Sequence, residues 1–157
     1  MNLDVRQYRK TDYDAYAQTL LLTLPCDDLD EAKENVDILL VRASEDNGEL
    51  WVAESGKKSV GFMLLAFDEK EGFVEIDWLD VHPQHKKQSI GTHLVIKAES
   101  RARERKCRTL GITTTSSNVG MQNFATQRGF GEFERIKEFW GEGTHDAVIY
   151  RLNLGPD

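Results

Sequence analysis

The segment from residue 82 to residue 92 combines positive charge with small side chains, between a predicted strand and a predicted helix. Its sequence is HPQHKKQSIGT. Amide groups that begin a helix have no partner inside the helix and attract anions, and the helix dipole adds to this attraction. Lys86 and Lys87 contribute positive charge, while Ser89 and Gly91 allow a ligand close to the backbone. These features suit a pyrophosphate, although a plain strand–helix turn with two solvated lysines has the same residues.

Two carboxylates, Glu75 and Asp77, stand two positions apart in a predicted strand. Side chains alternate along a strand, so both are expected on one face, with Ile76 and Trp78 on the other. Neighbouring carboxylates raise each other's proton affinity, which suits a group that accepts a proton. A solvent-facing strip on a half-exposed strand explains the same alternation.

The length and composition narrow the classes of protein to which this sequence could belong. The 157 residues suffice for a single domain over 1–157, and the net charge of −7 disfavours nucleic acid as a partner. No apolar run is long enough to cross a membrane, and the start has no apolar signal region. Cys26 and Cys107 lack metal-ligand spacing and are expected to be free thiols. We therefore expect a cytoplasmic protein without a membrane or a metal ion as partner, and leave a homodimer open.

The residue periodicity predicts which elements hold these candidates. Strands are expected at 5–8, 50–54, 60–67, 73–81, 109–115, 132–140 and 147–154. Asp12 is expected to cap a first helix that Pro25 ends, and Asp28 with Glu31 to cap a second. Further helices are expected at 91–106 and 118–128. Strand 73–81, helix 91–106 and strand 109–115 form a βαβ unit, so these two strands should run parallel.

Part of the segment resembles motif A of the GCN5-related N-acetyltransferases, the GNAT superfamily, written Gln/Arg-x-x-Gly-x-Gly/Ala. Lys86 falls at the first position of that motif, Ser89 at the first glycine and Gly91 at the second.

A second segment resembles motif B of the same family, Asn-x-x-Ala-x-x-x-Tyr-x-x-x-Gly-Phe. Asn118, Gly129 and Phe130 agree in type and spacing, while Met121 replaces the alanine and Ala125 the tyrosine. The order of elements along the whole chain also agrees with the family.

The resemblance implies an α/β (α+β) fold. Its mixed, mostly antiparallel sheet would have about seven strands, splayed between strands four and five, with helices on both faces. It also implies acetyl-CoA as co-substrate, bound in the splay without a metal ion. The matching coenzyme-binding positions are Leu79, Asp80, Val81, Lys86, Lys87, Gln88, Ser89, Ile90, Gly91, Thr92, Asn118, Asn123 and Phe124.

The reaction that the resemblance implies is direct attack of a neutral amine on the thioester within a ternary complex. A main-chain amide near Val81 would polarise the carbonyl, and Asp77, ranked ahead of Glu75, would accept the proton. Ala125 stands where the family often has a tyrosine that acts as general acid and protonates the leaving thiolate. The groups that could replace that acid are Tyr150, His82, His85 or a water molecule.

The acceptor side would be formed by the first two helices and the last hairpin. These carry acidic residues at 27, 28, 30 and 31 and the aromatic pair Phe139-Trp140. Such a lining suits a cationic amine, and a small-molecule amine is favoured. A peptide N-terminus is an alternative, because Phe139-Trp140 followed by Asp146-Ala147 is similar to a stretch of the protein N-terminal acetyltransferases. An acyl-CoA-binding module with weakened catalysis and a ligand-free interaction domain are further alternatives.

Overall fold

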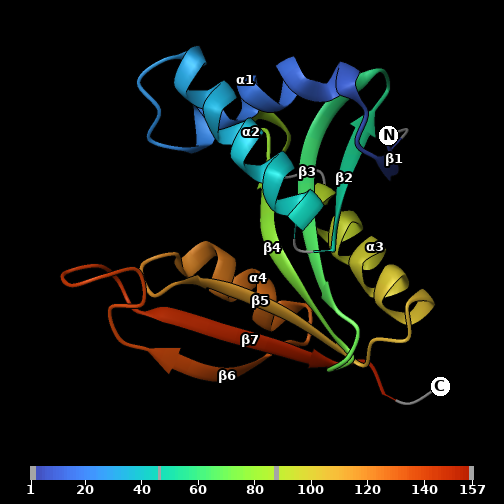
Figure 1. The fold of residues 1–157 in the computed structure, drawn as a ribbon, viewed down its shortest axis with the longest axis vertical. Coiled ribbons are helices and arrows are strands. Elements are labelled where there is room, and N and C mark those ends of the chain that lie inside the picture. The colour runs from blue at the N-terminus through green and yellow to red at the C-terminus, as the bar shows by residue number, and fades with distance from the viewer. Residues whose placement is uncertain (1–2, 46, 87–88, 156–157) are drawn as a thin grey trace.

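The computed structural model describes residues 3–45, 47–86 and 89–155, so the predictions for Lys87 and Gln88 lie outside the described residues. The elements follow the predicted order (Figure 1). The strands are β1 (Leu3–Gln7), β2 (Gly48–Ser55), β3 (Lys58–Asp68), β4 (Phe73–Val81), β5 (Thr109–Thr115), β6 (Gly131–Ile136) and β7 (Ala147–Asn153). The helices are α1 (Tyr13–Thr23), α2 (Leu29–Glu45), α3 (Ile90–Glu104) and α4 (Val119–Gln127), with 3-10 turns η1 (Lys10–Asp12) and η2 (Pro83–His85).

The seven strands form one mixed sheet in the order β1-β2-β3-β4-β5-β7-β6. β4 and β5 run parallel, as expected for strands joined by α3, and the other neighbouring pairs are antiparallel. The sheet topology therefore confirms the predicted mixed, mostly antiparallel fold.

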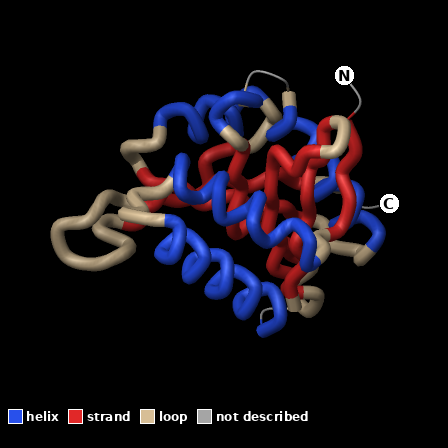
Figure 2. Tube along the Cα trace, turned by 90° about the horizontal axis from the view of Figure 1, so that it is seen from above, coloured by secondary structure: helices blue, strands red, loops and turns tan. Residues whose placement is uncertain are grey.

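Helices cover both faces of the sheet, as Figure 2 shows from above. On one face α1 and α2 pack on β2 and β3, where the ring of Tyr16 stacks on Phe62 with centroids 4.0 Å apart. On the other face α3 and α4 pack on β3, β4 and β5. Because β3 is covered on both faces, its central residues form a nearly continuous apolar run. Among the described residues, no helix combines the length and apolar character that a membrane span requires.

Two predictions at element ends are confirmed only in part. Asp12 occupies the N-cap position of α1, but its side chain makes no cap hydrogen bond, because its buried carboxylate accepts hydrogen bonds from Arg6 and Ser59 instead. The strand predicted at 132–140 ends at Ile136, and Phe139 and Trp140 lie in the turn that follows.

A β-bulge interrupts the alternation along β4. Leu64 pairs with Trp78 and Leu65 with Ile76, which leaves Asp77 as the extra residue. Ile76 consequently packs beneath α3, while Trp78 packs on the side of α1 and α2. The prediction that Ile76 and Trp78 share a face is therefore wrong.

Candidate active site

The sheet opens where β4 and β5 separate. The two strands pair only from Phe73 to Ile76, opposite Thr109 to Ile112. Beyond that point β4 continues to Val81 beside β3, and β5 continues to Thr115 beside β7, so the strands diverge (Figure 1). A strand edge without a neighbour presents main-chain groups to which an extended ligand can bind as an added strand.

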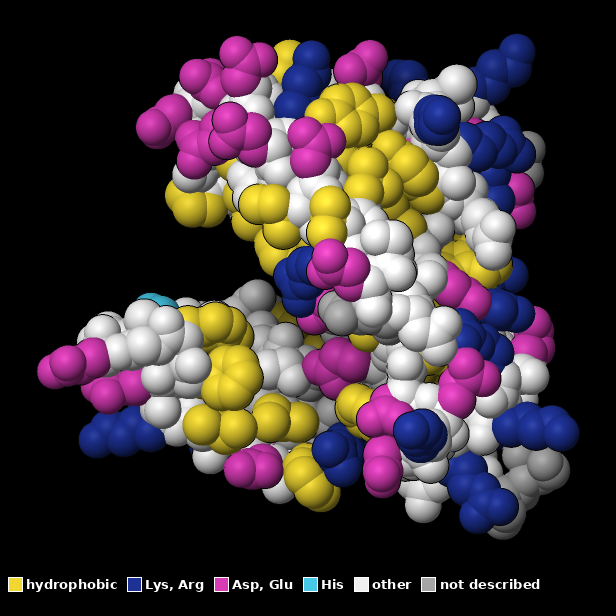
Figure 3. Space-filling model, viewed as in Figure 1, with side chains coloured by type: hydrophobic (Ala, Val, Ile, Leu, Met, Phe, Trp, Pro, Cys, Tyr) yellow, Lys and Arg dark blue, Asp and Glu magenta, His cyan; other side chains and the backbone are white. Residues whose placement is uncertain are grey.

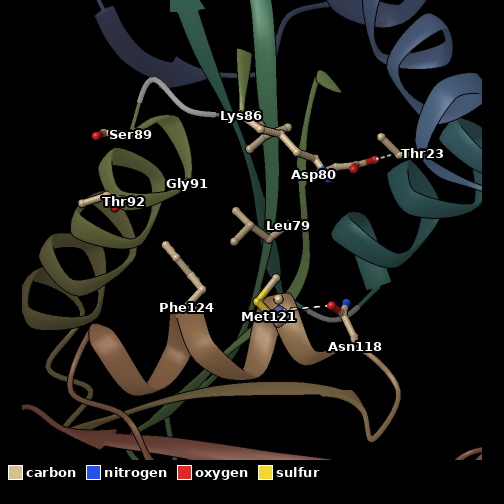
Figure 4. Close-up of a pocket in the computed structure, with 12 residues that line it drawn as sticks. Thr23, Leu79, Asp80, Lys86, Ser89, Gly91, Thr92, Asn118, Met121 and Phe124 are labelled. Atoms are coloured by element: carbon tan, nitrogen blue, oxygen red, sulfur yellow. Dashed lines mark hydrogen bonds between the residues drawn. The ribbon is translucent and has the colours of Figure 1, made fainter. Parts of the chain in front are cut away.

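A cavity of about 600 Å³ lies in this opening, and we call it the splay groove (Figure 4). Three of its sides are the outer part of β4, the start of α3, and α4. Its lining residues are Thr23, Leu79, Asp80, Val81, Lys86, Ser89, Gly91, Thr92, Asn118, Gly120, Met121 and Phe124.

The start of α3 supplies the groove with amide groups. Ser89 precedes the helix with φ of 62° and makes no side-chain cap hydrogen bond. This left-handed conformation is one that glycine adopts without steric cost, which explains why the matching motif has a glycine there. Its carbonyl oxygen lies 3.1 Å from the His93 amide nitrogen and 2.7 Å from His93 Nδ1, so His93 stabilises the first turn. The helix therefore begins with amides and a positive dipole end facing the groove.

α4 forms the opposite wall. Asn118 caps it, since its side-chain oxygen accepts the Met121 amide at 3.0 Å. Phe124 and Met121 project from α4 toward Leu79 of β4 (Figure 4). A Cβ at Gly91 would lie 3.5 Å from the Phe124 ring. Glycine at this position therefore keeps the gap between α3 and α4 open.

Asp80 carries a half-buried carboxyl on the β4 wall. It accepts a hydrogen bond of 2.7 Å from Thr23 of α1. Burial raises the pKa of Asp80 to about 6, although the Thr23 hydrogen bond and the charge of Lys86 act in the opposite direction. Asp80 can therefore exchange a proton near neutral pH.

A second cavity of about 600 Å³ adjoins the splay groove, and we call it the carboxylate pocket. Both cavities are lined by Leu79, Asn118 and Met121, so they meet at these three residues. The other residues of its lining are Leu24, Arg42, Glu75, Ile76, Asp77, Trp78, Ile112, Thr113, Thr114, Thr115, Phe139 and Trp140.

The two carboxylates in this pocket have different surroundings. Asp77, on the bulge, forms an ion pair with Arg42 of α2. Glu75 is half-buried, as Asp77 is, and accepts a hydrogen bond of 2.7 Å from the Thr113 hydroxyl. Partial burial raises the pKa of Glu75, the nearby charge of Asp77 adds to the rise, and Thr113 and Arg151 oppose it. A carboxyl whose pKa is raised in this way suits proton transfer.

The rim of the carboxylate pocket is aromatic and its surroundings are acidic. Phe139 and Trp140 are half-exposed, and their rings stand perpendicular with centroids 5.0 Å apart. Figure 3 shows a deep cleft between the β6–β7 loop and the α1–α2 end of the molecule, with Asp and Glu side chains gathered on the upper side. Asp27, Asp28 and Asp30 are exposed in this region. A cationic molecule would be attracted to this cleft.

The structure brings most of the predicted coenzyme positions into one cavity. Those that line the splay groove are Leu79, Asp80, Val81, Lys86, Ser89, Gly91, Thr92, Asn118 and Phe124. Ile90 packs in the core, so it can offer a ligand only its backbone. Asn123 is exposed on α4 and lines neither the splay groove nor the carboxylate pocket.

The side chains predicted as possible general acids line neither the splay groove nor the carboxylate pocket. Tyr150 packs in the core, and Ala125 is fully buried in the same cluster. His82 and His85 line a third cavity on the other side of η2. These positions leave a water molecule as the remaining candidate from the sequence.

Sequence reasoning missed three polar residues that contact the carboxyl groups of the site. Thr23, Arg42 and Thr113 bond to partners 57, 35 and 38 positions away. Arg42 stands in the last turn of α2, where a cation is commonly explained by the helix dipole. No local pattern identified these contacts, because the fold alone brings the partners together.

Comparisons with known proteins agree with this geometry. Residues 8–130 match the model of the acetyltransferase (GNAT) family. A search of curated protein sequences found no match. Among solved structures, a protein from Desulfovibrio desulfuricans assigned to the GNAT acetyltransferases superposes with a TM-score of 0.83 at 21% identity, covering 98% of this chain and 100% of its own.

Two further structures have named substrates. The ribosomal-protein-S18-alanine N-acetyltransferase of Escherichia coli has a TM-score of 0.79 at 15% identity, covering 99% of this chain and 96% of its own. An aminoglycoside 6'-N-acetyltransferase in complex with coenzyme A has a TM-score of 0.79 at 16% identity, covering 98% of both chains.

The family match covers most of the chain, and the fold superposes on these structures over nearly its whole length. The sequence and the fold therefore both indicate an acyltransferase. This chain belongs to the GNAT family of acetyltransferases.

Proposed function

We propose that the protein transfers an acetyl group from acetyl-CoA to a primary amine by direct attack in a ternary complex, and that the amine is a small molecule. The observation that carries this proposal is the meeting of two cavities at Leu79, Asn118 and Met121. One cavity offers amides and a lysine for a diphosphate, and the other holds carboxyl groups that can take up a proton. A thioester at the junction would therefore be accessible to an amine from the opposite side.

The splay groove suits acetyl-CoA in shape and charge. The pyrophosphate would bind at the start of α3, where amides and Lys86 provide positive potential. The pantetheine arm would lie along β4 from Leu79 to Val81, whose edge faces the opening. The thioester would then lie beside Met121 and Asn118, where the groove joins the carboxylate pocket.

Glu75 is the base that we favour, ahead of Asp77. Partial burial raises the pKa of its carboxyl, whereas the Asp77 carboxylate is engaged by Arg42. The amine nitrogen attacks the thioester carbon, a C–N bond forms and the C–S bond breaks. Glu75 accepts the ammonium proton, directly or through water, and the thiolate takes a proton from solvent.

The acceptor is proposed from the second cavity and its rim. A volume of about 600 Å³ is typical of a small-molecule site. Peptide N-termini are the second candidate, because Phe139 and Trp140 are exposed at the rim of an open cleft that could contact an extended chain. Acidic surroundings favour a cation in both cases.

A thiol-release assay with acetyl-CoA tests this proposal. The acceptor panel contains aminoglycosides and simple polyamines in one arm and peptides with free N-termini in the other. Turnover with the first arm supports the small-molecule acceptor, and turnover with peptides alone assigns the second candidate. If acetyl-CoA binds and no acceptor in either arm releases thiol, the weakened acyl-CoA-binding module replaces the enzyme proposal.

A further inference from the structure

A third cavity, of about 550 Å³, lies on the other side of η2 from the splay groove. It is bounded by β1, the turn between β2 and β3, the start of α1, and η2, and we call it the basic pocket. Its lining residues are Arg6, Arg9, Thr11, Asp12, Ala15, Gln18, Thr19, Glu54, Lys57, Lys58, Ser59, Val60, His82, Gln84 and His85. None of them lines either of the two cavities assigned to the transfer reaction.

The charge of this lining is opposite to that of the whole molecule. Arg6 forms ion pairs with Asp12 at 2.9 Å and with Glu54 at 2.8 Å, so both carboxylates of the pocket are engaged by one guanidinium. The other cationic side chains, Arg9, Lys57 and Lys58, have no ion-pair partner among the described residues. Figure 3 shows Lys and Arg side chains gathered at the upper right of the molecule, away from the acidic side of the cleft. On a protein with a net charge of −7, this is where an anion would be attracted.

Neutral donors add to the cations. His82 accepts the Gln84 amide through Nδ1 at 3.2 Å, so its neutral ring carries the proton on Nε2 and can donate it. Thr19 is fully buried, and its hydroxyl has no hydrogen-bond partner in the part of the chain that the structure describes. Buried hydroxyl groups are normally paired, so Thr19 is an unpaired donor just behind this wall of the pocket.

We propose that the basic pocket binds a small polyanion, a polycarboxylate or a phosphate, and that its occupancy tightens acetyl-CoA binding through η2. The link is the short segment between the two cavities. His82, Gln84 and His85 line the basic pocket, and Val81 and Lys86, at the two ends of this segment, line the splay groove. An anion that accepts from His82 Nε2 makes Nδ1 a better acceptor for the Gln84 amide, and so stabilises the turn that positions Lys86.

Calorimetric titration with citrate, a trivalent carboxylate, tests both parts of the proposal. Citrate is titrated into the protein alone and into the protein saturated with coenzyme A. We expect one citrate per chain in both titrations, with affinity about fivefold or more higher in the second, because coupling between two sites is reciprocal. Citrate that binds only the coenzyme-free protein would be competing for the splay groove, and would overturn the proposal.

Charge reversal separates the pocket from general attraction. The double variant Lys57→Glu/Lys58→Glu should weaken citrate binding at least about tenfold, since two rim cations become repulsive. Lys70→Glu is the control for reversing the charge of an exposed turn lysine. Lys70 lies between β3 and β4 and does not line the basic pocket. Equal citrate affinity in the double variant and the control would overturn the site, and equal citrate affinity with and without coenzyme A would overturn the coupling. Citrate binding to the protein alone tests the pocket even if coenzyme A fails to bind.

Discussion

At the level of single residues, the two carboxylates of β4 illustrate how surroundings decide chemical role. Glu75 and Asp77 are close in sequence and line the same pocket. The bulge brings Asp77 to Arg42, while Glu75 lies beside Thr113. Sequence reasoning identified the pair and ranked Asp77 ahead of Glu75. Neither the bulge nor the distant arginine is visible in the local sequence.

Replacing each carboxylate by its amide tests this assignment. Glu75→Gln should lower kcat about 100-fold or more with little change in coenzyme affinity, because a positioned base typically contributes that factor. Asp77→Asn, the matched control, should have a smaller effect, since it alters a charge that Arg42 already compensates. Steady-state kinetics with coenzyme A calorimetry measure both. Full turnover in Glu75→Gln would remove Glu75 from the mechanism.

The pH profile provides a test that leaves Glu75 in place. A base works when unprotonated, so kcat/KM should fall as the pH is lowered through the pKa of Glu75, which burial raises. The Thr113 hydroxyl stabilises the charged form, so Thr113→Val should raise this pKa further and move the fall in kcat/KM to higher pH. Thr115→Val is the control, because Thr115 bonds to Ser117 instead. An unchanged profile in Thr113→Val would contradict the assignment.

At the level of elements, the residue before α3 has a backbone conformation that its residue type does not favour. Ser89 has φ of 62°, and Lys106, just beyond the other end of the helix, has φ of 59°. A residue with a Cβ pays roughly 1 kcal/mol in this region, and glycine does not.

Ser89→Gly should therefore raise the free energy of unfolding by up to about 1 kcal/mol, less the entropy that glycine gains in the unfolded chain. Lys106→Gly should give a similar gain at a position outside the splay groove, which makes it the matched control. Denaturant unfolding measures both changes. A loss of stability in Ser89→Gly, with a gain in Lys106→Gly, would show that the Ser89 side chain stabilises the loop after all.

The elements themselves were largely predictable. Their order, the parallel β4–β5 pair and the helices on both faces follow from periodicity and from the βαβ unit. Differences occurred at element ends. Asp12 stands at the N-cap position of α1, but its carboxylate bonds to Arg6 instead of the helix backbone. The strand predicted to Trp140 ends at Ile136, and Glu138 beyond it has a positive φ of 46°.

For the whole molecule, the splay between β4 and β5 organises the candidate site. It separates the two strands beyond Ile76 and gives room for two cavities that meet at Leu79, Asn118 and Met121. Sequence motifs pointed to residues that line the splay groove, because a helix start with small residues is a local feature. The carboxylate pocket is lined by residues of α2, β4, β5 and the β6–β7 loop, and sequence reasoning gave only the charge and aromatic character of these segments.

Acetyl-CoA is proposed to bind in the splay groove, at the start of α3. Gly91→Leu tests it most directly, because a side chain at residue 91 would extend toward the Phe124 ring across the groove. Gly131→Leu is the control, since a Cβ at Gly131 meets nothing within 4 Å and Gly131 does not line the groove. The measurement is calorimetric titration of both variants and the wild type with acetyl-CoA. We predict one acetyl-CoA per chain in the wild type and in Gly131→Leu, and at least about tenfold weaker binding, or about 1.4 kcal/mol, in a folded Gly91→Leu. Equal affinity in all three proteins would contradict the assignment of the groove.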